Sequence, residues 1–305
     1  MQWNQIKTLF ILCFLALNVY LLYQLYEQQN KQQLFSDPIA STIEEQLEED
    51  NITIPESVLN TGELRESFMT VAQEKFTNND LIRFDQLKDQ RISIIDQTLI
   101  TSIIEETVII PENATEEMIT DFLKNLAPFM DEYVFWKWNK HLNIIMFFQQ
   151  KKDHSIYYNQ NALLLFFLDE DNRVVYYSLS KLSEEEDMQE SQKLISPIRA
   201  LETIYNSGQL YYGDTVNKVE VGYHTRIPSS SGVQVFVPTW KIIVNKTRQY
   251  FVNAIEGYVF ASNDSEFLSE ALNEDLKRIQ SSLDDQSSDK LRIVTYYKEK
   301  LELIH

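Results

Sequence analysis

Hydrophobic and polar positions divide the chain into an apolar start, a polar spacer and a long mixed region. Residues 9–26 (LFILCFLALNVYLLYQLY) contain no charge, and this stretch of 18 residues can cross a hydrocarbon core of about 30 Å as a helix. Residues 27–55 are polar and acidic. The pattern therefore predicts a leader at 1–8, a transmembrane anchor at 9–26 and an acidic stalk at 27–55, helical around Ser41–Glu49.

Two processed forms of the apolar segment are alternatives to an anchor. A cleaved signal peptide has a shorter apolar region followed by small residues, whereas VYLLYQLYEQQN offers only bulky or polar ones. A lipoprotein signal needs a small residue before the lipidated cysteine, but Ile11 and Leu12 precede Cys13. We therefore expect an uncleaved anchor.

Strand patterns dominate from residue 90 onward, because aromatic and β-branched residues fill runs separated by turn residues. RISIIDQ and TLITSIIEE predict a strand pair around Asp96 and Gln97. PENATEEMITDFLKNLA predicts a helix capped by Asn113 or Thr115. A meander follows, with the strands EYVFWKWN, NIIMFFQQ, HSIYY, ALLLFFLDE and RVVYYSLSKL.

The order of helix and meander then recurs. SPIRALETIYNSG predicts a helix capped by Ser196, with Pro197 first and Gly208 at its end. The strands TVNKVEVGYHTRI, VQVFVPTWKIIVN and YFVNAIEGYVFA follow. We predict an α+β fold in which a transmembrane helix precedes two helix-on-antiparallel-sheet modules, at 56–182 and 183–263. Residues 264–305 form a polar tail with a predicted helix followed by an ambiguous segment.

Composition excludes several kinds of function. The chain has 305 residues, 27 Lys and Arg against 46 Asp and Glu, and a net charge of −19, which opposes binding to nucleic acid. Its single Cys forms neither an internal disulfide nor a Cys-rich zinc site. The six Gly match no phosphate-binding loop. We therefore expect no nucleic acid, metal or cofactor.

Catalytic patterns are equally scarce. His141, His154, His224 and His305 lie far apart and match no metal-binding spacing, and no GxSxG motif occurs. Carboxylate pairs abound, but 46 acids guarantee such pairs by chance. A catalytic site needs a nucleophile, a base and oxyanion donors that converge in one pocket. We predict that the protein is not an enzyme.

The charge distribution predicts an orientation for the anchor. The leader carries Lys7 and no acid, while all 46 acids lie after residue 26. The positive-inside rule therefore places the leader in the cytoplasm and the remainder outside a single-pass cell-membrane helix. One face of that helix contains Ile11, Phe14, Asn18, Leu21 and Leu25. We expect this face to contact another transmembrane helix; Asn18 either forms an interhelical hydrogen bond there or is hydrated near the interface.

Two external features are candidate binding surfaces. Pro238 and Trp240 lie in VPTWKI, which predicts either a core tryptophan beside a strand bend, the favoured interpretation, or an exposed edge that pairs with a partner strand. A membrane-tethered module that binds a cell-wall fragment or peptide is an alternative function. Its natural site would be an aromatic groove formed by Tyr157, Tyr158, Tyr211, Tyr212 and Trp240.

The leader and anchor, MQWNQIKTLFILCFLALNVYLL, resemble those of the YycI (WalI) family. The shared features are Trp3, the Lys7–Thr8 pair and a late Asn18. ISPIRALETIYNSGQLYYGDTVNKVEVGYHTRI, VFVPTWKI and YFVNAIEGYVF are also similar to that family. The resemblance covers most of residues 1–262, and the tail after residue 263 has no clear counterpart.

The resemblance implies a regulatory protein of the WalK/WalR (YycG/YycF) two-component system of Gram-positive bacteria, which controls cell-wall homeostasis. Family members work with a YycH-like protein and contact the sensor histidine kinase through their transmembrane helices. Their external parts are built of α+β modules similar to PepSY domains and YycH. The family provides no catalytic residues to carry over.

Overall fold

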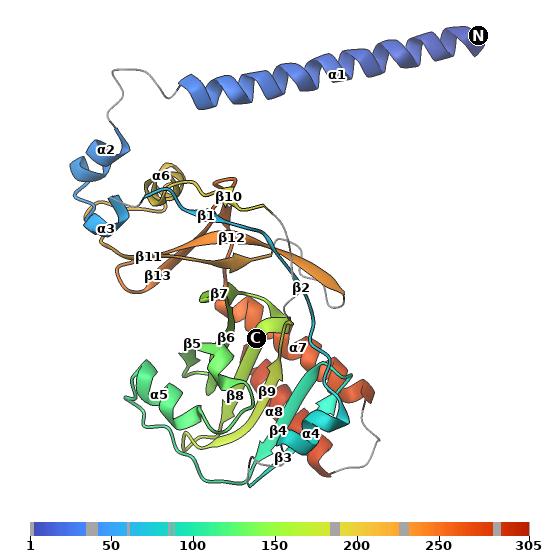
Figure 1. Cartoon of the computed structure of the whole chain (residues 1–305), viewed down its shortest axis with the longest axis vertical. Coiled ribbons are helices and arrows are strands. Elements are labelled where there is room, and N and C mark those ends of the chain that lie inside the picture. The colour runs from blue at the N-terminus through green and yellow to red at the C-terminus, as the bar shows by residue number, and fades with distance from the viewer. Residues whose placement is uncertain are drawn as a thin grey trace. The chain divides into compact units, whose positions relative to one another are not determined.

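The structure is a computed structural model that describes residues 3–34, 42–59, 62–84, 87, 89–183, 190–225, 232–282 and 288–304. Contacts divide the chain into two units, Met1–Asn51 and Ile52–His305. Figure 1 shows the whole chain, and each unit is described by itself below.

The described residues of the first unit form the helices α1 (Trp3–Leu34) and α2 (Ile43–Glu49). Within α1, Lys7–Gln24 is long and apolar enough to cross a membrane, which agrees with the predicted anchor. Helix α2 lies in the predicted stalk and begins with a capping box. The Thr42 hydroxyl accepts from the Glu45 amide, and the Glu45 carboxylate accepts from the Thr42 amide at 3.0 Å.

The second unit contains most of the helices and strands that the sequence predicts (Figure 1). Its helices are α3 (Glu56–Leu59), α4 (Asn78–Phe84), α5 (Glu116–Leu123), α6 (Pro197–Asn206), α7 (Asp264–Ser282) and α8 (Ser288–Glu302), with 3₁₀ turns η1 (Met130–Glu132) and η2 (Gln160–Ala162). Its strands are β1 (Arg65–Glu66), β2 (Met69–Ala72), β3 (Gln90–Ile95), β4 (Leu99–Ile104), β5 (Tyr133–Asn139), β6 (Ile144–Lys151), β7 (His154–Tyr157), β8 (Leu163–Leu168), β9 (Val174–Ser180), β10 (Gln192–Lys193), β11 (Val216–His224), β12 (Val233–Val244), β13 (Arg248–Asn253) and β14 (Val259–Phe260).

Twelve of these strands form one sheet, in the order β14-β13-β12-β11-β7-β6-β8-β9-β4-β3, with β2 on β12 and β5 on β6. Every pairing is antiparallel except β7 with β11, which is parallel. The α+β class is therefore confirmed. The predicted recurrence is also present, since α5 precedes β5–β9 and α6 precedes β11–β13.

Local sequence signals set the boundaries of these helices. The Thr115 hydroxyl, one of two predicted caps, accepts from the Met118 amide at the start of α5. Helix α6 begins after Ser196 with Pro197, as predicted, although the Ser196 side chain makes no capping bond. Gly208 ends α6 in the left-handed region, with φ of 70°.

Strands β6, β8 and β9 are buried on both faces of the sheet, which explains their continuous apolar sequences. Neighbouring residues of β8 enter different clusters: Leu163, Leu165 and Phe167 pack on one face, and Leu164, Phe166 and Leu168 on the other. Helix α5 contributes Ile119 and Leu123 to the second cluster. The cluster on the opposite face, with Leu163, Leu165 and Phe167, must be covered by another part of the chain.

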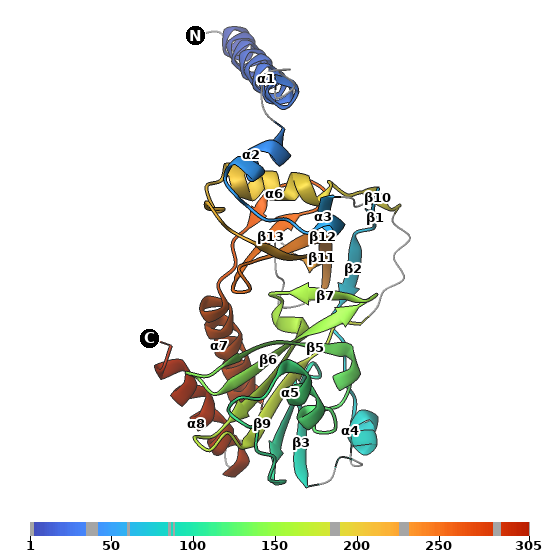
Figure 2. The same ribbon diagram turned by 90° about the vertical axis from the view of Figure 1, so that its left-hand side faces the viewer.

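Helices α7 and α8 provide that cover; the sequence predicts the first of them within a polar helical tail, but not its place in the core. They lie side by side against the sheet in Figure 2. Their buried side chains join β-strand residues in the first cluster; they are Phe267, Leu268, Ala271, Leu272, Ile279, Ile293 and Tyr297. The ambiguous segment 291–304 is thus mostly helical, and the tail completes the hydrophobic core.

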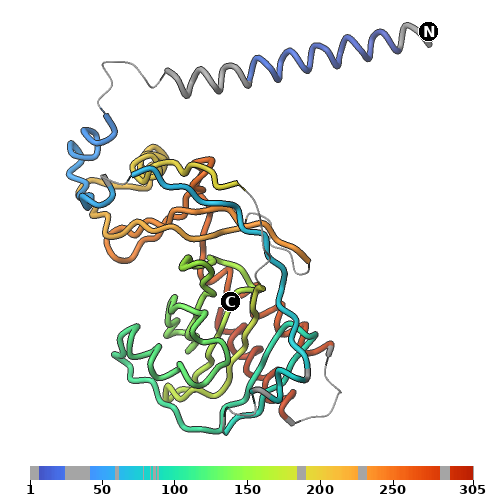
Figure 3. The backbone as a smooth tube through the Cα atoms, in the orientation of Figure 1, coloured from blue at the N-terminus to red at the C-terminus, as the bar shows by residue number. Residues whose placement is uncertain are grey.

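Pairing also crosses the predicted border between the modules at residues 182 and 183. Strand β2 pairs with β12, and β1 pairs with β10. The cyan trace of β2 runs beside the orange trace of β12 in Figure 3. In the middle of the sheet, β7 and β11 join through Ile156–Tyr223 and Tyr157–His224. We call this short parallel ladder the β7–β11 seam.

Candidate functional site

The predicted contact face of the anchor lies on a single regular helix. Ile11, Phe14, Asn18 and Leu21 have exposed side chains in α1, as an unpartnered membrane helix would. Leu25 also belongs to α1, but its side chain lies outside the described set. The five positions share one face of α1 by helical spacing. Contact between this face and another transmembrane helix stays a prediction.

Asn18 has a local partner that the sequence did not predict. Its side-chain Nδ2 donates to the Phe14 carbonyl oxygen, one turn earlier, at 2.9 Å. This bond satisfies one donor inside the helix and lowers the cost of placing an amide in hydrocarbon. The amide oxygen of Asn18 makes no hydrogen bond with the described residues. A partner helix would therefore meet Asn18 best with a donor group.

Pro238 and Trp240 occupy the interior of β12, which is the core position that the sequence favours. Both are buried, and Trp240 pairs with Val221 of β11 on one side and Val252 of β13 on the other. The Trp240 indole N–H donates to the Ile195 carbonyl at 3.0 Å. Strand β12 is flanked at these residues, so neither offers an open edge to a partner strand.

The five aromatic residues of the expected groove are not brought together. Tyr157 and Trp240 are buried, and Tyr158 lines a cavity with Trp136 and Asp264. Trp240 lines two other cavities. Tyr211 and Tyr212 are exposed in the segment between α6 and β11. This distribution does not form the shared aromatic groove that the alternative function needs.

The described histidines are dispersed as the sequence predicts. His154 contacts Glu66 at 3.2 Å, while His141 contacts the Leu303 carbonyl at 3.2 Å. His224 is mostly buried, and burial lowers its pKa to about 4. His305 lies outside the described residues. Within the described part of the chain, no group of three His, Cys, Asp or Glu side chains is placed to hold a metal ion.

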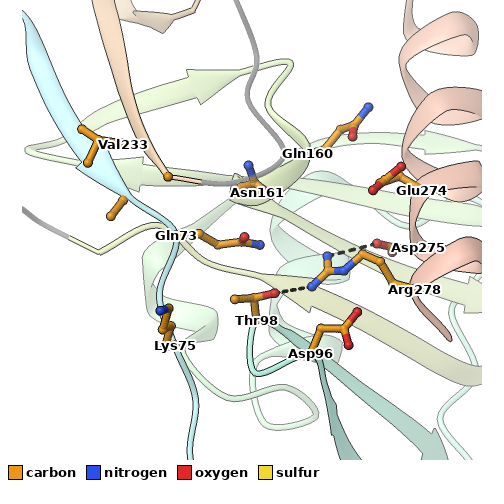
Figure 4. Close-up of a pocket in the computed structure, with 12 residues that line it drawn as sticks. Gln73, Lys75, Asp96, Thr98, Gln160, Asn161, Val233, Glu274, Asp275 and Arg278 are labelled. Atoms are coloured by element: carbon orange, nitrogen blue, oxygen red, sulfur yellow. Dashed lines mark hydrogen bonds and ion pairs between the residues drawn. The ribbon is translucent and has the colours of Figure 1, made fainter. Parts of the chain in front are cut away.

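A cavity of about 530 Å³ opens where α7 meets the β3–β4 turn. We call it the Arg278 cleft. Its lining comes from five parts of the chain, and Figure 4 shows how the labelled side chains converge. The lining residues are Ala72, Gln73, Lys75, Asp96, Thr98, Gln160, Asn161, Gly232, Val233, Glu274, Asp275 and Arg278.

The β3–β4 hairpin supplies the floor of the cleft. The loop between the paired residues Ile95 and Leu99 contains Asp96, Gln97 and Thr98, and Asp96 and Gln97 have positive φ, at 47° and 61°. This is the backbone of a type I′ turn, whose twist matches that of the paired strands. The turn brings Asp96 and Thr98 to α7, where the Arg278 Nη2 donates to the Thr98 hydroxyl.

Two side chains in the cleft have more N–H donors than the described residues supply acceptors for. The Arg278 side chain is only 15% exposed, yet its five N–H donors meet one hydroxyl, that of Thr98, and a carboxylate oxygen of Asp275 at 3.8 Å. The Nε2 of Gln73 is buried without a hydrogen-bond partner. Figure 4 shows Gln73 and Arg278 pointing toward each other across the cleft.

Asp275 lies behind Arg278 on the same helix. Its side chain is 13% exposed and accepts from the Tyr297 hydroxyl at 3.1 Å. Burial raises the pKa of Asp275 to about 6, and the Arg278 charge opposes that rise only in part. At neutral pH the cleft therefore contains a largely ionised carboxylate that burial disfavours.

The start of α7 is fixed by Asp264. Its carboxylate accepts from the Trp136 indole at 3.1 Å, the Tyr158 hydroxyl at 2.9 Å and the Lys137 ammonium at 2.7 Å. Burial alone would raise the pKa of Asp264, but these bonds outweigh burial and hold the pKa below its ordinary value. The anchoring of α7 at this end also fixes Asp275 and Arg278 further along the helix.

No sequence motif predicts this cleft. Asp275 and Arg278 have an ordinary i, i+3 helix spacing, and Gln73, Thr98 and Asn161 come from separate segments. The tail was expected to have no clear counterpart in the family, so nothing pointed to it as the wall of a site. The available signal was indirect: LLLFFL in β8 requires cover on both faces, and a helical tail can supply it.

These observations define a class: an α+β protein with one candidate membrane span near its N-terminus and, among the described residues, no group of side chains placed to hold a metal ion. A family model described as YycI protein matches residues 29–255, which is most of the chain. The chain therefore belongs to the YycI family. This is a regulatory family rather than an enzyme family, and membership suggests a regulator of the WalK two-component system.

Comparison with other proteins adds little to the family match. No curated protein matches the chain. Among solved structures, the chain is similar to an uncharacterized protein from Eubacterium rectale ATCC 33656, with 9% identity and a TM-score of 0.39. That match covers 65% of this chain and 87% of the other.

Proposed function

We propose that the protein is a non-enzymatic regulator of a WalK-like (YycG-like) sensor histidine kinase and acts through contacts between transmembrane helices. The observation that carries the proposal is the YycI family match over residues 29–255, joined to a candidate span at Lys7–Gln24. A YycH-like protein is the second partner in this proposal. The output is control of cell-wall homeostasis.

The proposed topology is a single-pass protein of the cell membrane with a cytoplasmic N-terminus. Support comes from Lys7, the first residue of the candidate span, and from the absence of acids in the first 26 residues. The candidate span is consistent with single-pass anchoring. In this arrangement residues 27–55 are a spacer, and 56–182, 183–263 and the tail 264–305 lie outside the cell.

The proposed contact face on α1 consists of Ile11, Phe14, Asn18, Leu21 and Leu25. Helices in lipid associate through close packing and hydrogen bonds, because lipid tails are as apolar as the side chains. Binding can change kinase output only if the anchor binds the two signalling states with different free energies. The face must therefore fit one arrangement of the kinase helices better than the other.

Replacing residues 8–26 with an unrelated polyleucine span tests this mechanism. The variant keeps the membrane attachment and the external part but removes the contact face. We expect it to reach the cell surface at the normal level and to lose regulation of WalK-dependent cell-wall genes, measured by transcript abundance. Normal regulation by the exchanged span would refute the helix-contact mechanism while leaving family membership untouched.

Asn18→Leu tests the polar contact within that face. An interhelical hydrogen bond in a membrane contributes about 0.6–2 kcal/mol, so we expect roughly 3- to 30-fold weaker kinase association. Co-purification from mildly solubilised membranes measures this loss. Cys13→Leu, at a position off the face in the same span, is the matched control and should leave association unchanged. Equal recovery of kinase with both variants would remove Asn18 from the interface.

A further inference from the structure

The Arg278 cleft has a chemistry that the proposed kinase contact does not use. Two of its side chains offer hydrogen-bond donors to a ligand: the Arg278 guanidinium, which is only partly paired by Thr98 and Asp275, and the Nε2 of Gln73, which is buried without a partner. A buried donor such as the Gln73 Nε2 is costly to leave without an acceptor. The two donors face the same cavity from opposite walls (Figure 4). The missing component is therefore an acceptor, and an anionic one suits Arg278 best.

The charges around the cleft restrict the kind of anion. Lys75 and Arg278 are cationic, whereas Asp96, Glu274 and Asp275 are acidic. A dianion such as phosphate would meet more negative than positive charge. A single carboxylate can instead be held by the guanidinium fork, which matches carboxylate geometry. Glu274 and Asp96 then face the rest of the ligand and favour a nearby cation.

The size of the cleft sets the third condition. A volume of about 530 Å³ lies within the range of small-molecule sites, which is about 300–1,000 Å³. Ala72 and Val233 add small apolar surfaces beside the polar groups. The space thus suits a short, weakly apolar molecule with a carboxylate and an ammonium group.

We propose that the Arg278 cleft binds the zwitterionic form of a short peptide, with the peptide carboxylate on Arg278 and Gln73 and its ammonium group toward Glu274 and Asp96. This proposal rests on the cleft alone and is independent of the helix contacts proposed for the anchor. Because the lining joins β2, the β3–β4 turn, η2, β12 and α7, the peptide would contact both halves of the sheet and the tail at once.

Calorimetric titration of the full chain in detergent micelles, with three forms of the dipeptide Ala-Ala, tests the proposal without any mutation. The free dipeptide carries both charges, the N-acetylated form only the carboxylate, and the C-amidated form only the ammonium group. We expect the free dipeptide to bind most tightly and the amidated form at least about tenfold more weakly, because it lacks the charge that pairs with Arg278.

Variants then assign the subsites. Arg278→Lys keeps the charge but loses the planar fork, and we expect at least about tenfold weaker binding of the free dipeptide. Gln73→Leu should weaken binding about three- to tenfold. Arg292→Lys changes an arginine of α8 that lies over the Tyr296 ring, outside the cleft, and serves as the matched control. Near-ultraviolet circular dichroism confirms that each variant is folded.

Several outcomes would overturn the proposal. Equal binding of the amidated and free forms would exclude a carboxylate site, and absence of any binding at about 10 mM dipeptide would exclude a peptide site of useful affinity. Tighter binding of inorganic phosphate than of the dipeptide would show that the cleft binds anions without selecting a peptide. Equal binding of the acetylated and free forms would remove the ammonium subsite.

Discussion

At the scale of single residues, burial makes the charge of Asp275 unfavourable for the stability of the fold. The free energy of ionising its carboxyl is less favourable in the folded chain than in the unfolded one, since burial raises its pKa from 3.8 to about 6. A shift of about 2 pH units corresponds to about 3 kcal/mol. Between these two pKa values the folded chain binds a proton that the unfolded chain does not, so the free energy of unfolding falls as pH rises through this window.

Asp275→Asn should remove this pH-dependent loss. The amide keeps an oxygen that can accept from Tyr297 and carries no charge at any pH. We expect the variant of residues 52–305 to be about 1–3 kcal/mol more stable at pH 7.5 and to show little gain near pH 4, measured by urea unfolding. Asp289→Asn, at an exposed pair with Arg91, is the control and should change stability by less than about 1 kcal/mol. A uniform effect of Asp275→Asn across pH would contradict the assignment.

Asn18 shows that a polar residue in a membrane span can be recognised from the sequence although its hydrogen-bond partner cannot. An amide in an apolar run is easy to detect, and the prediction offered a partner helix or interfacial water. The bond to the Phe14 carbonyl is a third arrangement that depends on the helix backbone one turn away. The sequence therefore located the polar group correctly but did not account for a local bond to main chain.

At the scale of elements, the two tail helices α7 and α8, here called the tail hairpin, are part of the hydrophobic core. Leu272 on α7 is fully buried in the cluster that contains Phe148, Phe167 and Phe251. We predict that Leu272→Ala lowers the free energy of unfolding of residues 52–305 by about 2–5 kcal/mol, because it leaves a cavity between helix and sheet. Urea unfolding measures the change.

Leu291 provides the matched control for that substitution. It lies on α8 of the same hairpin but is 66% exposed, so Leu291→Ala should stay within about 0.5 kcal/mol of the wild type. A similar small effect of Leu272→Ala would mean that the hairpin does not cover the sheet as described. The two substitutions remove the same atoms, so their difference isolates burial.

Most strands and the helices α5 and α6 were predictable because their signals are local. Turn residues, β-branched runs and a capping Thr115 determine them within a few positions. The partners of those strands were not predictable. Nothing near Met69 or Val71 indicates that β2 joins β12, because pairing depends on residues that are distant in sequence. The Arg278 cleft was missed for the same reason.

At the scale of the whole molecule, the β7–β11 seam holds the two halves of the sheet together. Gly222 lies there, and an added Cβ would approach the Ser155 carbonyl oxygen to 2.7 Å and overlap the Tyr157 ring. We predict that Gly222→Ala lowers the free energy of unfolding by about 1–3 kcal/mol or more, through a forced separation of β7 and β11. Thermal and urea unfolding of residues 52–305 check this.

Gly62→Ala is the control for the seam. No atom lies within 4 Å of the Cβ position at Gly62, and its φ is not in the left-handed region. We expect a change of less than about 0.5 kcal/mol. If Gly222→Ala is equally mild, the strands at the seam are further apart than the structure shows, and the halves of the sheet are joined mainly by other contacts.

The pairing of β2 with β12 has a consequence for the order in which the chain can fold. The two strands are separated by more than half the length of the chain, so β2 leaves the ribosome long before its partner exists. Until β12 appears, the backbone groups of residues 69–72 that will bond to it have no strand to pair with. The pairing of β2 with β12 therefore forms late, and such long-range strand pairing favours slow folding.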